Sequence, residues 1–151
     1  MKKDYKKWHP LKKKINNADD ARPFFHEREI WFCYLGENVG FGQDGVGDDF
    51  LRPIIVVRKF NNEIFWGLPL TKKEKKSPYY FAFPFAAGTS VAILSQIRLI
   101  DAHRLSYHIG EIAEINFAQL KKRLKEPFAM SRFPFIPPPC GEVGPKPFVK
   151  V

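Results

Sequence analysis

Hydrophobic residues gather in short runs between residues 30 and 99, and these runs predict β-strands. They are rich in branched and aromatic side chains, which favour strands. The runs cover residues 30–35, 53–59, 63–69, 78–84 and 91–99. Asn61-Asn62, between the second and third runs, is typical of a tight turn. Five short strands with short links predict a mainly β (α+β) fold, with a mostly antiparallel, curled sheet or a small barrel.

A helical pattern follows the strands. Phe117, Leu120 and Leu124 recur at helical spacing, and Asn116 with Gln119 can form a capping box, so we expect a helix over residues 117–125. Pro127 follows this segment and should end it, because proline cannot continue a helix.

Both ends of the chain differ from this central region. Tyr5, Trp8, Leu11 and Ile15 come close to helical spacing, but Pro10 and the polar run 16–20 interrupt it. The tail has prolines at 134, 137, 138, 139, 145 and 147 and should be extended or disordered. We therefore expect a basic N-terminal extension over residues 1–25, a barrel domain over 26–127 and a proline-rich tail over 128–151.

Glycines punctuate the link between the first two strands. Gly40, Gly42 and Gly45 spell G-x-G-x-x-G, the pattern of a dinucleotide-binding turn. That turn requires a helix to begin at the third glycine. The residues after Gly47 have no helical period and lead into another strand. The pattern therefore predicts a flexible loop between strands.

Positive charge is concentrated in the extension. The chain of 151 residues carries a net charge of +9, and residues 1–14 hold seven lysines and Asp4, which amounts to +6. Two interpretations stay open: the arm docks on an anionic partner such as RNA, or it is a solvated face.

The sequence offers little for metal or triad chemistry. Cys33 and Cys140 form no C-x-x-C or Cys/His group, and the four histidines show no nucleophile-base pattern. We expect no metal and no cofactor. The scarcity of cysteines and the lack of a signal peptide or membrane span favour the cytoplasm.

Arginine and hydroxyl residues stand at the predicted strand ends, and these residues carry a resemblance. Six segments follow one another over residues 27–126: EIWFCYL, the glycine-rich loop with Gln43, LRPIIVVRKF, GLPLT ending at Thr71, SVAILSQIRLIDAHRL and the terminal helix. Together they resemble the PemK/MazF family of toxin endoribonucleases.

The resemblance implies an SH3-like barrel with a C-terminal helix. It implies a homodimer that cuts single-stranded RNA without metal and is silenced by a cognate antitoxin protein. The catalytic pair of the family falls on Arg52 and Thr71. Further residues on the same segments are candidates for RNA binding: Gln43, Lys72, Lys73, Ser95, Gln96 and Arg98.

Some positions depart from the family pattern. Residues 40–43 lack the acid or histidine that relatives place in this loop, and Ser95 stands where some relatives have aspartate. The general base therefore stays unnamed. Candidates for stacking on bases are whichever of the following aromatic residues are exposed: Phe41, Phe50, Trp66, Tyr79 and Tyr80.

Three functions compete at this point. The first is a sequence-selective endoribonuclease that leaves 2′,3′-cyclic phosphate and 5′-hydroxyl ends. The second is a protein-binding toxin that resembles the CcdB gyrase inhibitors, and the third is a non-catalytic RNA-binding module. Arg52 and Thr71 favour the nuclease. The lysines after Thr71 either track an RNA backbone or form a charged hairpin tip.

Overall fold

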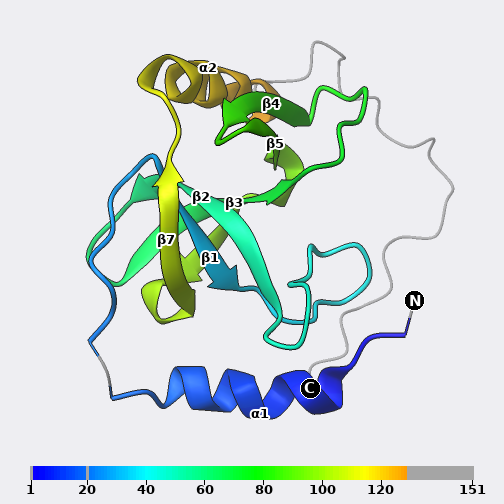
Figure 1. Ribbon diagram of the computed structural model, residues 1–151, viewed down its shortest axis with the longest axis vertical. Coiled ribbons are helices and arrows are strands. Elements are labelled where there is room, and N and C mark those ends of the chain that lie inside the picture. Colours follow the sequence, from blue (N-terminus) through cyan, green and yellow to red (C-terminus); the bar gives the residue numbers. More distant parts are fainter. Residues whose placement is uncertain (1, 20, 129–151) are drawn as a thin grey trace, which may run out of the picture.

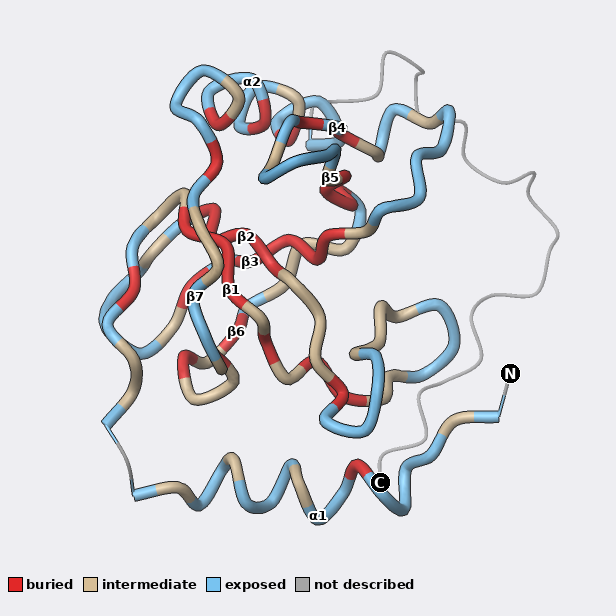
Figure 2. Tube along the Cα trace, in the orientation of Figure 1, coloured by how far each residue is buried: buried red, intermediate tan, exposed pale blue. Residues whose placement is uncertain are grey.

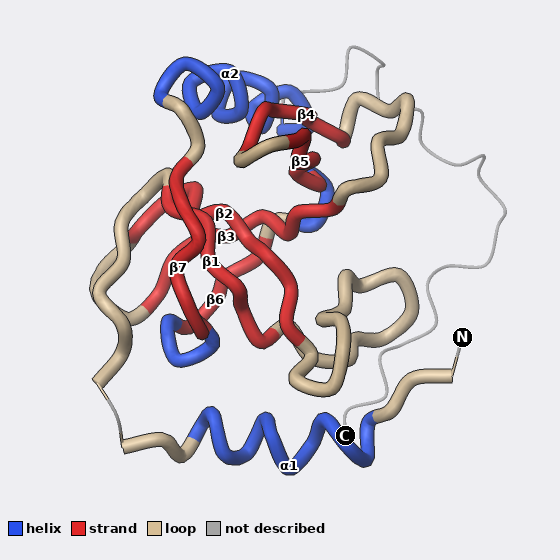
Figure 3. The backbone as a smooth tube through the Cα atoms, in the orientation of Figure 1, coloured by secondary structure: helices blue, strands red, loops and turns tan. Residues whose placement is uncertain are grey.

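A curled antiparallel sheet with one helix on each side forms the molecule (Figures 1 and 3). The computed structural model describes residues 2–19 and 21–128. Its strands are β1 (Glu29–Tyr34), β2 (Leu51–Lys59), β3 (Ile64–Thr71), β4 (Tyr80–Phe85), β5 (Gly88–Ile93), β6 (Arg98–Asp101) and β7 (Leu105–Glu111). They lie in the order β4-β5-β3-β2-β1-β7, and β6 pairs with β3.

The predicted fold class, mainly β with a C-terminal helix, is confirmed. The sheet stays open, because over the described part of the chain β4 and β7 lie at opposite ends of the strand order. The predicted turn after β2 is confirmed as well: the Asn61 side-chain oxygen accepts from the backbone N–H groups of Glu63 (2.8 Å) and Ile64 (2.9 Å). This side-chain turn fixes the register of β2 and β3.

One strand prediction was wrong, and one strand was missed. The single strand expected over residues 91–99 is divided into β5, a 3₁₀ turn (Leu94–Gln96) and β6, which pair with different parts of β3. Strand β7 was not predicted. Leu105, Tyr107 and Ile109 do alternate with polar residues, but Leu105 is the one buried residue of this short strand.

The C-terminal helix α2 (Glu114–Lys125) begins earlier than predicted. Its N-cap is Ala113, whose carbonyl oxygen accepts from the Phe117 N–H at 2.9 Å, and Asn116 lies inside the first turn. The predicted cap at Asn116 was therefore wrong. Phe117, Leu120 and Leu124 are buried against the sheet, as their spacing predicts.

The N-terminal extension contains a helix, α1 (Tyr5–Asn16), which continues through Pro10. The Asp4 side chain caps it by accepting from the Lys7 N–H at 3.0 Å. Most of α1 is exposed and one side chain, that of Trp8, is buried (Figure 2). The interruption expected at Pro10 was wrong.

The sheet separates two groups of core side chains. One group, on the α2 side, includes Ile55, Leu68, Phe83 and Leu120. The other, on the opposite side, includes Phe25, Ile54, Phe65 and Ile100. Side chains alternate across a strand, so neighbouring residues such as Ile54 and Ile55 serve different cores.

The C-terminal end of the chain is described only as far as residue 128. The predicted proline-rich tail over residues 128–151 therefore lies outside the described residues, except for Phe128, which ends a 3₁₀ turn (Glu126–Phe128).

None of the helices in the described part has the length and apolar character needed to cross a bilayer.

Candidate functional site

The glycine-rich segment is a loop that folds back on itself between β1 and β2. The Gly45 N–H donates to the Gly36 carbonyl at 2.8 Å, and Val46 and Leu51 exchange backbone hydrogen bonds. A Cβ on Gly45 would lie 1.6 Å from the Phe50 carbonyl oxygen, so only glycine allows this approach. Strand β2 follows the loop directly, and this confirms a strand connection in place of a dinucleotide-binding turn.

Arg52 and Thr71 come from adjoining strands. Ile54 on β2 pairs with Pro69 on β3 in an antiparallel register. Continuing that register by two residues puts Arg52, near the start of β2, opposite Thr71, at the end of β3. The strand pairing thereby makes neighbours of two residues that lie far apart in the sequence.

The Arg52 guanidinium is held by two backbone carbonyl groups. Its Nε–H donates to the Asp44 carbonyl oxygen, and Nη1 donates to the Leu70 carbonyl oxygen at 3.1 Å. Burial lowers the pKa of Arg52, while the nearby Asp44 carboxylate raises it. A guanidinium has five N–H donors, so three of them stay available to a ligand.

Thr71 offers a hydroxyl with its own backbone partner. Its Oγ1 accepts from the Lys73 N–H at 3.2 Å. The hydroxyl hydrogen can still be donated, because the Lys73 contact uses only a lone pair.

Two hollows in the surface include both residues. One, of about 250 Å³, is lined by Gln43, Arg52, Thr71, Lys73, Lys75, Tyr80 and Ile93. The other, of about 760 Å³, includes Arg52, Thr71 and Lys72 together with the β4–β5 turn. The predicted catalytic pair, Gln43, Lys72 and Lys73 therefore lie around one region of the surface, which we call the Arg52 site.

Gln96 contacts the glycine-rich loop and does not line either hollow. Its Oε1 accepts from the Gln43 N–H at 3.2 Å, and its Nε2 donates to the Phe41 carbonyl at 3.1 Å. The side chain thus ties the loop to the 3₁₀ turn after β5. This position suits a residue that holds the loop in place and does not contact a ligand bound at the Arg52 site.

Ser95 and Arg98 lie outside the Arg52 site. Ser95 is exposed, and neither residue lines either hollow. Burial, followed by the neighbouring Arg104 charge, lowers the pKa of Arg98. The geometry gives these two residues no direct contact with a ligand bound at Arg52.

The aromatic candidates fall into different environments. Phe41 is 99% exposed on the loop, and Tyr80 lines the smaller hollow, where the Lys75 Nζ lies 5.6 Å from its ring centroid. Phe50 is buried, and Trp66 lines a separate hollow beside α2. Burial therefore removes Phe50 from the candidates, while Phe41 and Tyr80 can meet a base.

Acidic groups are absent from the described residues that line the two hollows, and so is histidine.

Elsewhere, the ligand atoms of Glu29, His108 and Glu111 lie within 4.8 Å of one another. The Glu29 carboxylate already accepts from the His26 N–H (2.9 Å) and the Trp31 Nε1–H (2.8 Å). It has internal partners that a metal ion would have to displace.

The arrangement of strands, loop and helix agrees with comparisons with known proteins. Residues 26–128 match the family model of the PemK-like, MazF-like toxin of type II toxin-antitoxin systems. The chain belongs to the PemK/MazF-like toxin family. A search of the curated proteins found no match.

Solved structures of MazF-like proteins share this fold. A MazF from Deinococcus radiodurans is 17% identical and superposes with a TM-score of 0.55, covering 74% of this chain and 100% of its own. The toxin MazF-mt6 from Mycobacterium tuberculosis is 14% identical with a TM-score of 0.53, covering 69% and 99%. An endoribonuclease from a mycobacterial species, solved with its cognate antitoxin, is 15% identical with a TM-score of 0.53, covering 74% and 99%.

Proposed function

We propose that this MazF-like protein is a toxin endoribonuclease that cuts single-stranded RNA at preferred sequences without a metal ion. The observation that carries the proposal is the position of Arg52 and Thr71 on adjoining strands around one hollow. Membership of the family and a mycobacterial neighbour named as an endoribonuclease support it.

The substrate supplies its own nucleophile in this mechanism. The ribose 2′-hydroxyl oxygen attacks the adjacent phosphorus and loses its proton to water, because the described lining residues include no carboxylate or imidazole. The bond from phosphorus to the 5′-oxygen breaks, and that oxygen takes a proton from water, which balances the proton that the 2′-hydroxyl released. The products carry a 2′,3′-cyclic phosphate and a 5′-hydroxyl.

Arg52 stabilises the charge that develops on the phosphate oxygens. Two of its N–H groups are fixed by the Asp44 and Leu70 carbonyls, so the remaining donors point from a preset plane. Preset donors cost little reorganisation when charge develops. Thr71 donates its hydroxyl to a phosphate oxygen, and Lys72 and Lys73 contact the flanking backbone.

Gln43 and the exposed ring of Phe41 contact bases next to the cut. Gln96 acts through the loop that it holds, and Ser95 and Arg98 take part only if the RNA extends beyond the hollows. We place this reaction in the cytoplasm, in a homodimer whose activity a cognate antitoxin blocks. A neighbour solved with its antitoxin supports that partner.

The test is digestion of mixed RNA by purified protein in EDTA, with mapping of the fragment ends. Discrete fragments that end in cyclic phosphate are expected. They should disappear with Arg52→Ala and persist with Arg58→Ala, since Arg58 is an exposed arginine on the same strand. A substrate with 2′-deoxyribose at the cleavage position should stay intact.

Other outcomes identify the competing functions. Intact RNA that is tightly retained would replace the nuclease with an RNA-binding module. Intact RNA without retention, together with inhibition of gyrase, would indicate the protein-binding toxin. Cleavage that stops in EDTA would refute the metal-independent mechanism.

A further inference from the structure

Helix α1 lies outside the residues that match the toxin family, yet it contacts the loop beside Arg52. Figure 1 shows the N-terminal end of α1 directly below the loop between β1 and β2. The Trp8 ring packs against Phe50 with centroids 5.5 Å apart. Gly36 has a φ of +72°, and a Cβ there would lie 2.0 Å from the Trp8 ring. The start of the loop is thus shaped to receive this tryptophan.

Lys3, just before α1, holds the loop by its ammonium group. Its Nζ donates to the carbonyl oxygens of Asn38 and Gly40, the latter at 2.9 Å, and lies 2.9 Å from the Asp44 carboxylate. The side chain is only 13% exposed. An ammonium has three donors, and here three different residues of the loop supply its acceptors.

Asp44 connects Lys3 to Arg52. Its carboxylate faces Lys3 and also accepts from the Asn38 N–H at 2.6 Å, while its carbonyl oxygen accepts from the Arg52 Nε–H. Lys3 therefore helps to fix the position of the Asp44 backbone. The Asp44 backbone in turn fixes the position of the Arg52 guanidinium.

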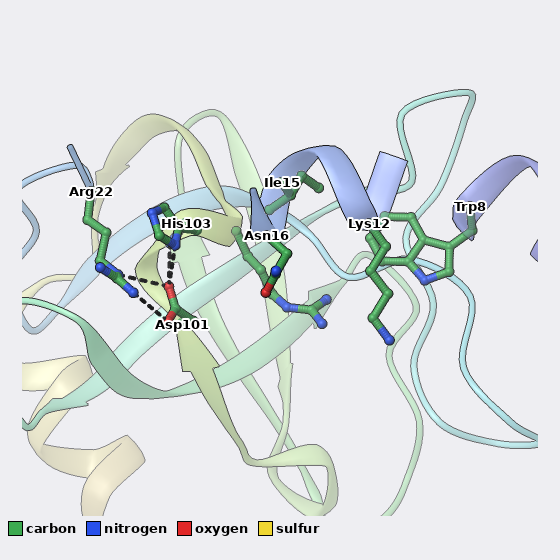
Figure 4. Close-up of a pocket in the computed structure, with 8 residues that line it drawn as sticks. Trp8, Lys12, Ile15, Asn16, Arg22, Asp101 and His103 are labelled. Carbon is green, nitrogen blue, oxygen red and sulfur yellow. Dashed lines mark hydrogen bonds and ion pairs between the residues drawn. The ribbon is translucent and has the colours of Figure 1, made fainter. Parts of the chain in front are cut away.

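The segment after α1 is fixed as well. Figure 4 shows Arg22 directed at Asp101, whose two carboxylate oxygens accept from Nε and Nη2 at 3.0 Å each. The same carboxylate accepts from the His103 N–H at 2.9 Å. A cavity of about 260 Å³ lies between α1 and this cluster, with Trp8 and Arg22 among its lining residues. The arm is thus attached to the sheet at both ends.

We infer that Lys3 is a positioning residue for the Arg52 site, and that the N-terminal arm holds the glycine-rich loop in the arrangement that binds the RNA phosphate. The inference rests on the proposed nuclease function. A loop with several glycines loses much conformational freedom when it becomes ordered. Contacts that order it before RNA binds lower that cost at the moment of binding.

Lys3→Met tests this inference because it removes the ammonium and keeps an unbranched apolar stem. The matched control is Lys6→Met, which removes the same charge from an exposed position of α1. Both are measured in the full chain, first by hydrogen exchange of the amides of residues 36–48 without RNA, and then by kcat and KM on RNA.

Lys3→Met should speed exchange in the loop and raise KM, because the loop must then be ordered when RNA binds. It should also lower kcat about tenfold, since small displacements of a catalytic group have effects of this size or more. The melting temperature of Lys3→Met should stay close to that of wild type. Lys6→Met should match wild type in loop exchange, in kcat and KM, and in melting temperature. Unchanged loop exchange in a folded Lys3→Met protein would overturn the inference, even if activity falls.

A second variant covers the case in which Lys3→Met does not fold. Asp44→Asn removes the same ion pair from the side of the loop and keeps the carbonyl that Arg52 uses. It too should speed loop exchange, and protection equal to that of wild type would overturn the inference. If wild type cuts no RNA but loop exchange responds as expected, the nuclease proposal fails and the holding role of Lys3 stands.

Discussion

The Arg52 guanidinium on β2 donates a hydrogen bond of 3.1 Å to the carbonyl oxygen of Leu70, the residue before Thr71 on β3. This bond ties the two strands together at the proposed site. It also orients the guanidinium plane, because a second bond runs to the Asp44 carbonyl. An arginine held at two points is a directed donor rather than a mobile surface charge.

Arg52→Lys should therefore lose most of the RNA cleavage although it keeps the charge. Lysine cannot reach both carbonyl groups while it contacts a phosphate, and loss of one preorganised donor typically lowers kcat by about 10²–10³-fold. Single-turnover cleavage of a mapped RNA measures this. Activity of Arg52→Lys within a factor of about three of wild type would mean that charge alone suffices.

Thr71→Val should lower kcat by about tenfold or more, because the isosteric side chain cannot donate to the phosphate. Thr71→Ser keeps the hydroxyl and should retain most activity. The comparison isolates the hydroxyl from the shape of the side chain, and equal rates for Val and Ser would remove Thr71 from the mechanism.

The double variant Lys72→Gln, Lys73→Gln should weaken the dependence of RNA binding on salt. Removal of one lysine–phosphate pair should reduce the slope of log affinity against log salt by about 0.7 for single strands. Binding of a 2′-deoxy substrate, measured from low to moderate salt, gives the slope without cleavage. Lys122→Gln on α2 is the control, and an unchanged slope in the double variant would favour the charged hairpin tip.

Cys33 should resist alkylation in the folded protein. It lies fully buried on β1, and burial raises the pKa of its thiol to about 12. The thiolate is the reactive form, so it is scarce at about pH 8. Mass spectrometry of the peptide that contains Cys33 should find it unlabelled by iodoacetamide in buffer and labelled in guanidinium chloride. Rapid labelling in buffer would contradict its burial.

The Arg22–Asp101 pair should stabilise the protein at neutral pH and not in acid. The hydrogen bonds from Arg22 are the largest cause that holds the pKa of Asp101 below its ordinary value. Its contribution is thus full above about pH 5 and is lost as the pH falls through the folded-state value. The carboxylate is 41% exposed, so Asp101→Asn should cost only about 0.5–1 kcal/mol at about pH 7. Urea unfolding of both proteins at about pH 7 and about pH 3 should show this difference vanish in acid, and a difference that persists would assign it to another cause.

Much of the sheet could be predicted from sequence, because β1 to β4 carry branched and aromatic residues in short runs. The β5–β6 segment was harder. Ile97 continues the apolar run, but the 3₁₀ turn before it redirects the chain. Strand β7 pairs with β1 at the edge of the sheet, and of its apolar side chains Leu105 is buried while Tyr107 is exposed, so its apolar pattern is weaker than that of the central strands.

The sequence likewise predicts some residues of the candidate site and not others. Arg52, Thr71 and Gln43 could be found because motifs mark them. The part played by Lys3 could not, because it depends on contacts with residues 35 to 41 positions away. A lysine in a run of lysines gives no local sign that its ammonium is enclosed, whereas a strand leaves a period of apolar residues.

The two cores on opposite sides of the sheet bear on how this chain can vary. Trp8 rests on Gly36, Phe50 and Arg104 and enters neither core group. A helix attached in this way can be gained or lost without repacking the interior that all the strands share. The arm therefore acts on the loop beside Arg52, while the packing of the toxin body rests on the two core groups.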